Sequence, residues 1–321
     1  MKFKEIGWNG FLMKVPEEMH ITRQGGNSNK GTFSIESEDS LIEFSWNSIS
    51  KKSEPLLSIV EQITDRIKKD AGKKKIQFSL EEKKDTVVNN HDAVYLRLKY
   101  GIEERYYVWK CQESNRLIAI RFVFREYGEK ARKIVKQLLN SIQCHIEGKD
   151  VWSLMKLRFE IPKTFLLSDA RIEVGKSHIE LVENKLAMFE ERKRTIYVNY
   201  FPMANVRFKD TYKDPEKWFE KNHLKDFKKT LKKRKINFKT IGKKKVEGHE
   251  IIIKQARMTS GLFTRSSDLC SAAFWYCPEM NRIYFLALNS KVTRPFFFKR
   301  RLKKKEHDDL FNEILESFRC H

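Results

Sequence analysis

Two short segments of alternating apolar and polar residues stand at matching places in the two halves of the chain. Phe11–Pro16 and Leu157–Pro162 each alternate with a period of two and end at a proline. This pattern is typical of a half-buried strand whose hydrogen-bond ladder stops at the proline. Similar runs predict further strands at 31–36, 41–46, 178–181 and 196–200.

Apolar residues at helical spacing follow in each half. The segments 53–55 (SEP) and 214–216 (DPE) place a polar residue just before a proline, which predicts a helix start. A second amphipathic helix is predicted at the end of each half, at 129–143 and at 305–319. The apolar faces of the early helices comprise Leu56, Ile59, Ile63 and Ile67 in the first half and Trp218, Phe219, Phe227 and Leu231 in the second.

Strands and a hairpin lie between the two helices of each half. We expect strands at 76–80 and 236–241, and then a hairpin in which 93–100 pairs with 105–110 across a turn at 101–104. In the second half, 250–258 pairs with a strand that ends at Tyr276, through a longer loop that includes Gly261. The last strands are expected at 117–124 and 283–288.

The order of elements predicts the fold class. Each half runs strands, helix, strands, helix, which indicates an α+β domain with helices covering an antiparallel sheet. The chain of 321 residues has the length for two such domains, and its 40% hydrophobic residues can supply two cores. We therefore expect one repeat at 1–147 and a second at 148–321, joined by a short linker at 146–152.

The two halves also share a sequence motif. Residues 108–116 (VWKCQESNR) and 274–282 (FWYCPEMNR) have Trp-x-Cys-x-Glu-x-Asn-Arg in common. A histidine precedes each motif and a Cys-His pair follows it, which indicates an internal duplication. The shared cysteines and histidines are His91, Cys111, Cys144 and His145 in the first half and His249, Cys277, Cys320 and His321 in the second.

This arrangement resembles the superfamily that includes the photosystem subunit PsbP and the Ran-binding nuclear import factors. The resemblance rests on the opening strand that ends in Pro16 or Pro162, the early helix, the hairpin entries at 88–91 and 246–249, and the closing helix. It covers most of both halves and implies the fold. It also implies a non-enzymatic binding or assembly module, because members of that superfamily act mostly as such modules.

Spacing predicts that the shared residues meet. Opposed residues of an antiparallel hairpin lie at equal distances from its centre. His91 and Cys111 average to position 101, and His249 and Cys277 average to 263, so each pair lies side by side at the open end of its hairpin. The closing helix must return toward that end, which brings in the Cys-His pair that follows it. Two cysteines and two histidines are typical of a closed structural zinc site, one per repeat.

Other interpretations of these residues remain open. The cysteines can be inert buried thiols, or they can form disulfides, and the histidines can cap helix ends. His321 is the last residue and can offer its carboxylate in place of its ring. Cys270 has no counterpart and is interpreted as packing. Glu113, Asn115 and Arg116 can form a tight turn in which Asn adopts left-handed angles, or Glu113 and Arg116 can orient the ligands.

Positive charge is concentrated in the second half. The chain has a net charge of +22, of which 1–147 carry +5, with 26 Lys and Arg against 21 Asp and Glu. Such charge suits an acidic partner, either a protein or a nucleic acid. The basic runs 225–245 and 299–305 lie near aromatic residues 296–298, which can stack on bases. The residues of this candidate anion or nucleic-acid surface are Lys228, Lys229, Lys232, Lys233, Arg234, Lys299, Arg300 and Arg301.

Enzyme motifs are missing from the sequence. It has no glycine-rich phosphate loop, nucleophile elbow or zincin helix. A closed four-ligand site leaves no position for a reactive water, whereas a three-ligand site would make a metal-dependent hydrolase the alternative.

The sequence has no apolar run of transmembrane length and no signal-peptide pattern, so we expect a cytoplasmic protein whose cysteines are reduced.

Overall fold

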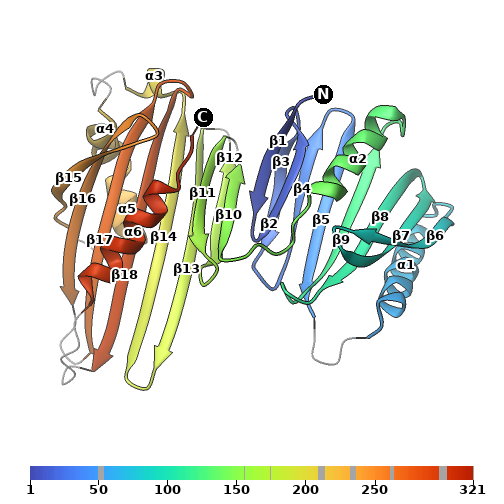
Figure 1. Cartoon of the computed structure of the whole chain (residues 1–321), viewed down its shortest axis with the longest axis horizontal. Coiled ribbons are helices and arrows are strands. Elements are labelled where there is room, and N and C mark those ends of the chain that lie inside the picture. Colours follow the sequence, from blue (N-terminus) through green and yellow to red (C-terminus); the bar gives the residue numbers. More distant parts are fainter. Residues whose placement is uncertain are drawn as a thin grey trace. The chain divides into compact units, whose positions relative to one another are not determined.

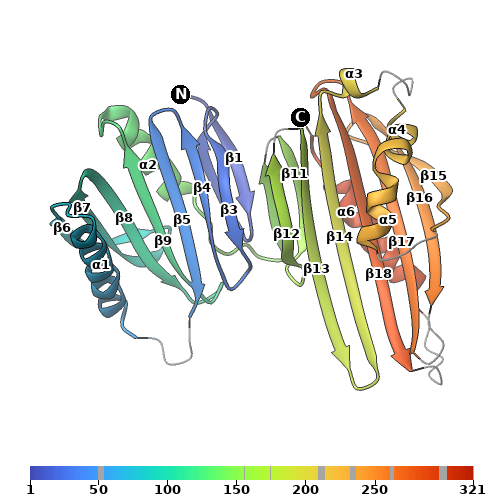
Figure 2. The ribbon, with the colours of Figure 1, turned by 180° about the vertical axis from the view of Figure 1, so that it is seen from behind.

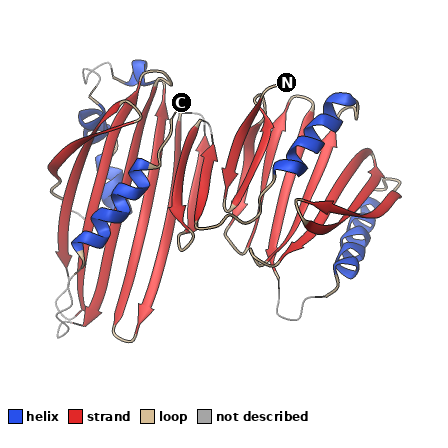
Figure 3. Cartoon of the chain, viewed as in Figure 1, coloured by secondary structure: helices blue, strands red, loops and turns tan. Residues whose placement is uncertain are grey.

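The computed structural model describes residues 1–49, 54–154, 156–173, 175–208, 214–231, 236–260, 264–295 and 302–320. It divides into two compact units, Met1–Met155 and Lys156–His321, called here the first and the second unit. Each unit is mainly antiparallel sheet with few helices, as Figure 3 shows. The antiparallel sheet is confirmed, but the helices cover only part of it.

The first unit contains a seven-stranded antiparallel sheet of order β3-β4-β5-β9-β8-β7-β6. The hairpin β1–β2 lies outside that sheet, and β10 pairs with β1 through Gly7 and Ser153. Its elements are β1 (Phe3–Trp8), β2 (Phe11–Pro16), β3 (His20–Gly26), β4 (Lys30–Ser37), β5 (Ser40–Ser48), α1 (Leu56–Lys73), β6 (Ser79–Val88), β7 (His91–Tyr100), β8 (Ile102–Cys111), β9 (Arg116–Phe124), α2 (Glu129–Ser141) and β10 (Lys149–Leu154).

The second unit has a sheet of the same form, with the order β12-β13-β14-β18-β17-β16-β15. The position of each strand within this order matches that of its counterpart in the first unit. Its elements are β11 (Leu157–Pro162), β12 (Leu166–Glu173), β13 (Lys176–Ala187), β14 (Glu190–Pro202), α3 (Ala204–Arg207), α4 (Pro215–Asn222), α5 (Leu224–Thr230), β15 (Lys239–Val246), β16 (His249–Ser260), β17 (Thr264–Cys277), β18 (Arg282–Pro295) and α6 (Lys304–Glu316).

Helices lie on both faces of each sheet. Figures 1 and 2 show α1 and α2 on opposite faces of the first sheet, and α6 opposite α4 and α5 in the second unit. Of the four α1 residues predicted to face the core, Leu56, Ile63 and Ile67 pack against a cluster around Val60 and Leu96. In the second unit, Trp218, Phe219, Phe227 and Leu231 join a core that also contains Cys270.

Some boundaries differ from the sequence prediction. The segment expected to be a linker contains the start of β10, because its residues find a partner strand in β1. The early helix of the second half is two short helices that meet at His223. The turn expected at 101–104 is shorter, because Tyr100 pairs directly with Ile102 and Gly101 alone turns the chain, at a φ of 79°.

Candidate metal centres

His91 begins β7 directly after a two-residue turn. Asn89 and Asn90 have φ angles of 42° and 67°, the left-handed geometry that such tight hairpin turns need and that Asn tolerates. Val88 pairs with His91 across this turn, which holds the histidine at the end of the sheet. In the second unit, Val246 pairs with His249 across a turn whose residues are Glu247, at 49°, and Gly248, at 79°.

The neighbouring strand carries the first cysteine to the same end. Ala93 pairs with Trp109 in β7–β8, and continuing this register by two residues sets Cys111 opposite His91. The pairing of Ile252 with Phe274 in β16–β17 likewise leads to His249 and Cys277. The two registers are centred on positions 101 and 263, as the spacing predicted.

A tight turn follows each of these cysteines. Asn115 and Asn281 have φ angles of 51° and 50°, and their backbone N–H groups donate to the oxygens of Gln112 and Pro278 over 3.1 Å. The predicted left-handed Asn is therefore confirmed in both units. The turn starts β9 or β18 immediately beside the cysteine.

The chain after the closing helix returns to the same end because it joins a strand. Helix α2 ends at Ser141 and not at the expected 143, since Gln143 exchanges two backbone hydrogen bonds with Leu12, of 2.9 and 2.7 Å. Arg319 and Arg158 make the same pair, both of 2.8 Å, so α6 ends at Glu316. Each of these pairs of hydrogen bonds positions the next residue, Cys144 or Cys320, at its cluster.

A hydroxyl repeats this attachment in both units. The Oγ of Ser141 accepts from the backbone N–H of Lys14 over 2.9 Å, and the Oγ of Ser317 accepts from that of Glu160 over 2.9 Å. Ser141 and Ser317 occupy matching positions before the two Cys-His pairs. The end of each closing helix is thus fixed against the same place on an opening strand.

In the first unit the side chains of His91, Cys111, Cys144 and His145 form one cluster. One ligand atom from each lies within 4.8 Å of all the others. The Nδ1 of His145 is 3.2 Å from the Sγ of Cys111 and 3.7 Å from that of Cys144, and the Nε2 of His91 is 3.6 Å from Cys144 Sγ. Zinc bond lengths imply edges of about 3.3–3.8 Å in a tetrahedral site with these donors. The separations of 3.6 and 3.7 Å lie within that range, and the separation of 3.2 Å lies just below it.

In the second unit, His249, Cys277 and Cys320 form the equivalent cluster, also within 4.8 Å of one another. All three residues are buried. The fourth candidate, His321, lies outside the described residues. All five cysteines of the chain are free thiols in the structure, and Cys270 lies in the core, as predicted for a packing residue.

Groups around the first cluster favour a metal-binding form of its histidine. The Nδ1 of His91 lies 2.9 Å from the oxygen of Asn89 and 3.2 Å from that of Val88, so Nδ1 carries the hydrogen and donates it. The Nε2 atom, which faces Cys144, then has the lone pair that a metal requires. Asn89 also donates from its side chain to the Ile142 oxygen over 2.6 Å, which ties this turn to the end of α2.

A glutamate two residues after the first cysteine contacts it in both units. Cys111 Sγ lies 3.5 Å from a carboxylate oxygen of Glu113, and Cys277 Sγ lies 3.3 Å from one of Glu279. The Cys277 distance suits a thiol that donates to a carboxylate. Arg116 instead donates to the backbone oxygens of Asn9 and Ser28, over 2.8 and 3.0 Å, and so holds loops together.

The thiols differ in their proton affinity. In the first unit, a hydrogen bond from Cys144 lowers the pKa of Cys111 and, as its counterpart, raises the pKa of Cys144. In the second unit, burial raises the pKa of Cys277 and raises that of Cys320 to about 12. Metal binding at either cluster therefore has to displace protons.

Most of the predicted basic surface lies outside the described residues: Lys232, Lys233, Arg234, Lys299, Arg300 and Arg301. The two described members, Lys228 and Lys229, lie on α5, where Lys229 is exposed and pairs with Asp226 at 3.2 Å. A different group of cations, Lys185, Arg192 and Arg194, shares one face of the second sheet and was not predicted. The spacing by two of Arg192 and Arg194 along β14 was the available signal.

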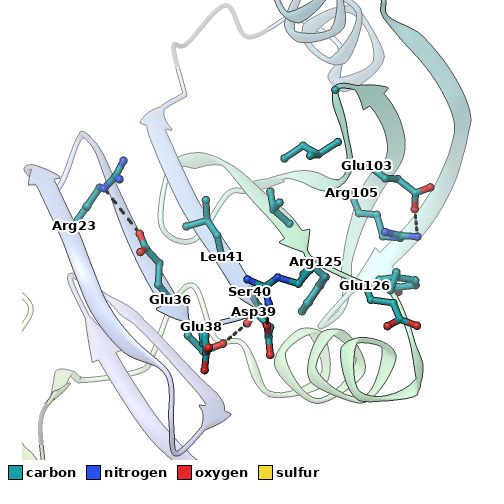
Figure 4. A pocket seen from close by; sticks show the side chains of 16 residues that line it. Arg23, Glu36, Glu38, Asp39, Ser40, Leu41, Glu103, Arg105, Arg125 and Glu126 are labelled. Carbon is teal, nitrogen blue, oxygen red and sulfur yellow. Dashed lines mark hydrogen bonds and ion pairs between the residues drawn. The ribbon is translucent and has the colours of Figure 1, made fainter.

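A broad groove in the first unit lies at the opposite end of the strands from the first cluster. It has a volume of about 830 Å³ and is lined by the β4–β5 turn, the start of β8 and the end of β9. Figure 4 shows its charged side chains pairing with each other, among them Arg23 with Glu36, and Arg105 with Glu103. The charged groups of the groove thus pair with each other, whereas the Cys/His clusters bring together several possible metal ligands.

No protein family matches the sequence, and no curated protein is similar to it. Among solved structures, the chain is similar to cyanobacterial PsbP (CyanoP) from Synechocystis sp. PCC 6803, with 10% identity over 44% of this chain and 91% of that one, and a TM-score of 0.36. It is also similar to the immunity protein TplEi of the T6SS from Pseudomonas aeruginosa, with 11% identity over 100% of this chain and 97% of that one, and a TM-score of 0.33.

A second structure of TplEi, in complex with the "L" peptide, matches with 9% identity over 99% of this chain and 98% of that one, and a TM-score of 0.33. A PsbP structure is thus among the matches, as the resemblance of the sequence led us to expect. At these TM-scores the likeness carries no inference about fold or function. In the described residues, no helix has the length and apolar character needed to cross a membrane.

Proposed function

We propose that the chain is a non-enzymatic tandem binding module whose two units each hold a structural zinc ion and which binds an acidic partner. The observation that carries this proposal is the cluster of four ligand atoms in the first unit, all within 4.8 Å of one another. Two thiolates and two imidazoles complete a tetrahedral shell, and a complete shell leaves no position for a reactive water.

The place of each cluster supports a structural role. His91, Cys111 and Cys144 come from a hairpin turn, a strand end and the segment after the closing helix, which are separate elements of the first unit. An ion bound there joins these elements, and its binding energy adds to folding because the unfolded chain has no such site. In the second unit, His249, Cys277 and Cys320 supply three of the ligands.

Net charge supports the acidic partner. Residues 148–321 carry 39 Lys and Arg against 22 Asp and Glu, a net +17. A field of this size attracts polyanions and increases their rate of association. Its concentration in one half indicates that the second unit makes the contact.

Elemental analysis and thiol counting test the metal part. On protein prepared with reductant and without chelator, we expect about two zinc ions per chain, one for each unit. Five thiols should react after unfolding in chelator, in agreement with five free cysteines. No metal together with five reactive thiols would remove the zinc ions, and fewer thiols would indicate disulfides.

Binding of model polyanions tests the partner. Polyglutamate and single-stranded DNA should bind the wild-type chain, and the affinity should fall steeply between 50 mM and 200 mM salt because bound counterions are released. Polylysine of equal length is the control and should not bind. Failure of both polyanions to bind would overturn the acidic partner, whatever the metal content is.

A further inference from the structure

A basic cavity in the second unit lies beside the start of α6. It has a volume of about 140 Å³, enough for at least four water molecules. Strands β13, β14 and β18 line it together with residues 302–307. The cavity lies within a single unit and at a different place from the Cys/His cluster there.

Strand register places three cations on the face that α6 covers. Arg194 pairs with Ser290, whose Oγ lies 2.7 Å from the Nδ1 of His307 on α6. Arg192 pairs with Val292, and Lys185 pairs with Arg192. Because directly opposed residues point to the same face of a sheet, all three cations lie on the α6 side.

These cations outnumber the carboxylates beside them. Glu183 accepts from Arg194 over 2.6 Å and from Lys185 over 3.1 Å, so one carboxylate serves two cations. Two further pairs are local in sequence: Arg192 with Glu190, and Lys303 with Glu306 at 2.5 Å. Within this group, four cations share three carboxylates, an excess of one positive charge.

Helix α6 adds to this charge. It is 13 residues long, and no side chain among the described residues caps its start at Lys303. The first N–H groups of a helix lack backbone partners and carry about half a positive charge. This excess of positive charge suits a phosphate group, which carries a charge of about −1.5 to −2 near neutral pH.

The cations are also accessible. Lys185, Arg192, Arg194 and Lys303 expose between 28% and 64% of their side chains, while Ser290 and His307 form a buried floor. Each arginine pairs through its Nε atom, so its outer N–H groups remain for a ligand. Arginine donors in this arrangement suit the oxygens of a phosphate, which accept two hydrogen bonds at once.

We propose that this cavity binds a phosphate group through Lys185, Arg192, Arg194 and the start of α6. The phosphate is either the free ion or a phosphorylated side chain of the partner. This site rests on the proposed function, since it names the chemical group of the acidic partner that the second unit recognises. It is separate from the zinc sites and does not require them.

Calorimetric titration tests the site with two probes, inorganic phosphate and a peptide that carries one phosphoserine. The variants Lys185→Gln and Arg192→Gln each remove one cation. In Lys185→Gln, Glu183 still pairs with Arg194. Lys193→Gln is the matched control, because Lys193 lies between the two arginines on the opposite face. Circular dichroism confirms that all variants are folded.

We expect each cavity variant to lower the affinity for the bound probe by about tenfold. The control variant should lower it by less than twofold. Binding of inorganic phosphate identifies the free ion as ligand, and binding of the phosphopeptide alone identifies a modified partner. If neither probe binds, or if Lys193→Gln weakens binding as much as the cavity variants do, the site is overturned. If polyglutamate still binds all variants equally, the proposed function survives without this site.

Discussion

The Sγ atom of Cys111 lies 3.2 Å from the Nδ1 atom of His145, although 34 positions separate the two residues in the chain. The register of β7–β8 fixes the cysteine, and the bridge between Leu12 and Gln143 fixes the segment that contains the histidine. The contact therefore depends on backbone pairing and not on the two side chains alone. Matching pairings occur in the second unit.

Replacing a zinc ligand should lower the metal content by one ion. We expect Cys144→Ser to bind about one zinc per chain in place of about two, because a serine hydroxyl does not replace the thiolate. At free zinc 100-fold above its dissociation constant, the missing site removes about 2.7 kcal/mol of stability. Elemental analysis and thermal unfolding measure both effects. Cys270→Ala is the control and should keep both ions; equal zinc loss there would contradict the assignment.

The turns after Cys111 and Cys277 should respond differently to glycine. Asn115 and Asn281 both have left-handed φ angles, so the backbone strain of an alanine at either position should cost about 1 kcal/mol. The Asn281 side chain also bonds the backbone N–H and the side chain of Asn205, over 2.9 and 2.6 Å. Asn281→Gly should therefore cost about 1 kcal/mol more than Asn115→Gly in urea unfolding. Equal costs would show that these two bonds add nothing.

The sequence predicted the clusters better than it predicted the surfaces. Hairpin spacing placed His91 opposite Cys111 because sheet register follows a simple count once the turn centre is known. The end of α2 was misjudged because Gln143 continues the helical pattern but pairs with Leu12, and a pattern within one segment does not report a distant partner. Lys185 and Arg194 were missed for the same reason, since their common face depends on which strands pair.

Buried His307 should make stability depend on pH. Burial lowers the pKa of His307 to about 4 from an ordinary value near 6.5, so protonation favours the unfolded chain. The His307 contribution is fully present above about pH 6.5 and is lost as pH falls toward 4, by up to about 3 kcal/mol. Ser271, Ser290, Asp308 and Arg194 face this ring.

Comparison with His307→Gln isolates this effect. Glutamine can still bond the two serine hydroxyls but does not titrate. The difference in the free energy of unfolding between wild type and variant should shrink between pH 7 and pH 4, as measured by urea unfolding at each pH. A difference that stays constant over this range would contradict the buried neutral histidine.

Two carboxylates that contact the same arginine should differ greatly in their effect on stability. Glu104 is fully buried and accepts from Arg121, from Tyr106 over 2.6 Å and from Tyr100 over 2.9 Å. Removing it in Glu104→Ala should cost about 3 kcal/mol, because three donors lose their acceptor. Glu43 is partly exposed and lies 3.8 Å from Arg121, so Glu43→Ala should cost less than about 0.5 kcal/mol. Similar costs in urea unfolding would disprove the buried network.

X-ray absorption at the zinc edge tests the central claim most directly, if it is applied to the Cys277→Ser variant. This variant loses a ligand of the second unit and leaves the first cluster intact. We predict one tightly bound zinc with two sulfur neighbours at about 2.3 Å and two nitrogen neighbours at about 2.0–2.1 Å. Binding of no zinc, or a shell with oxygen in place of either sulfur, would contradict a closed site at His91, Cys111, Cys144 and His145.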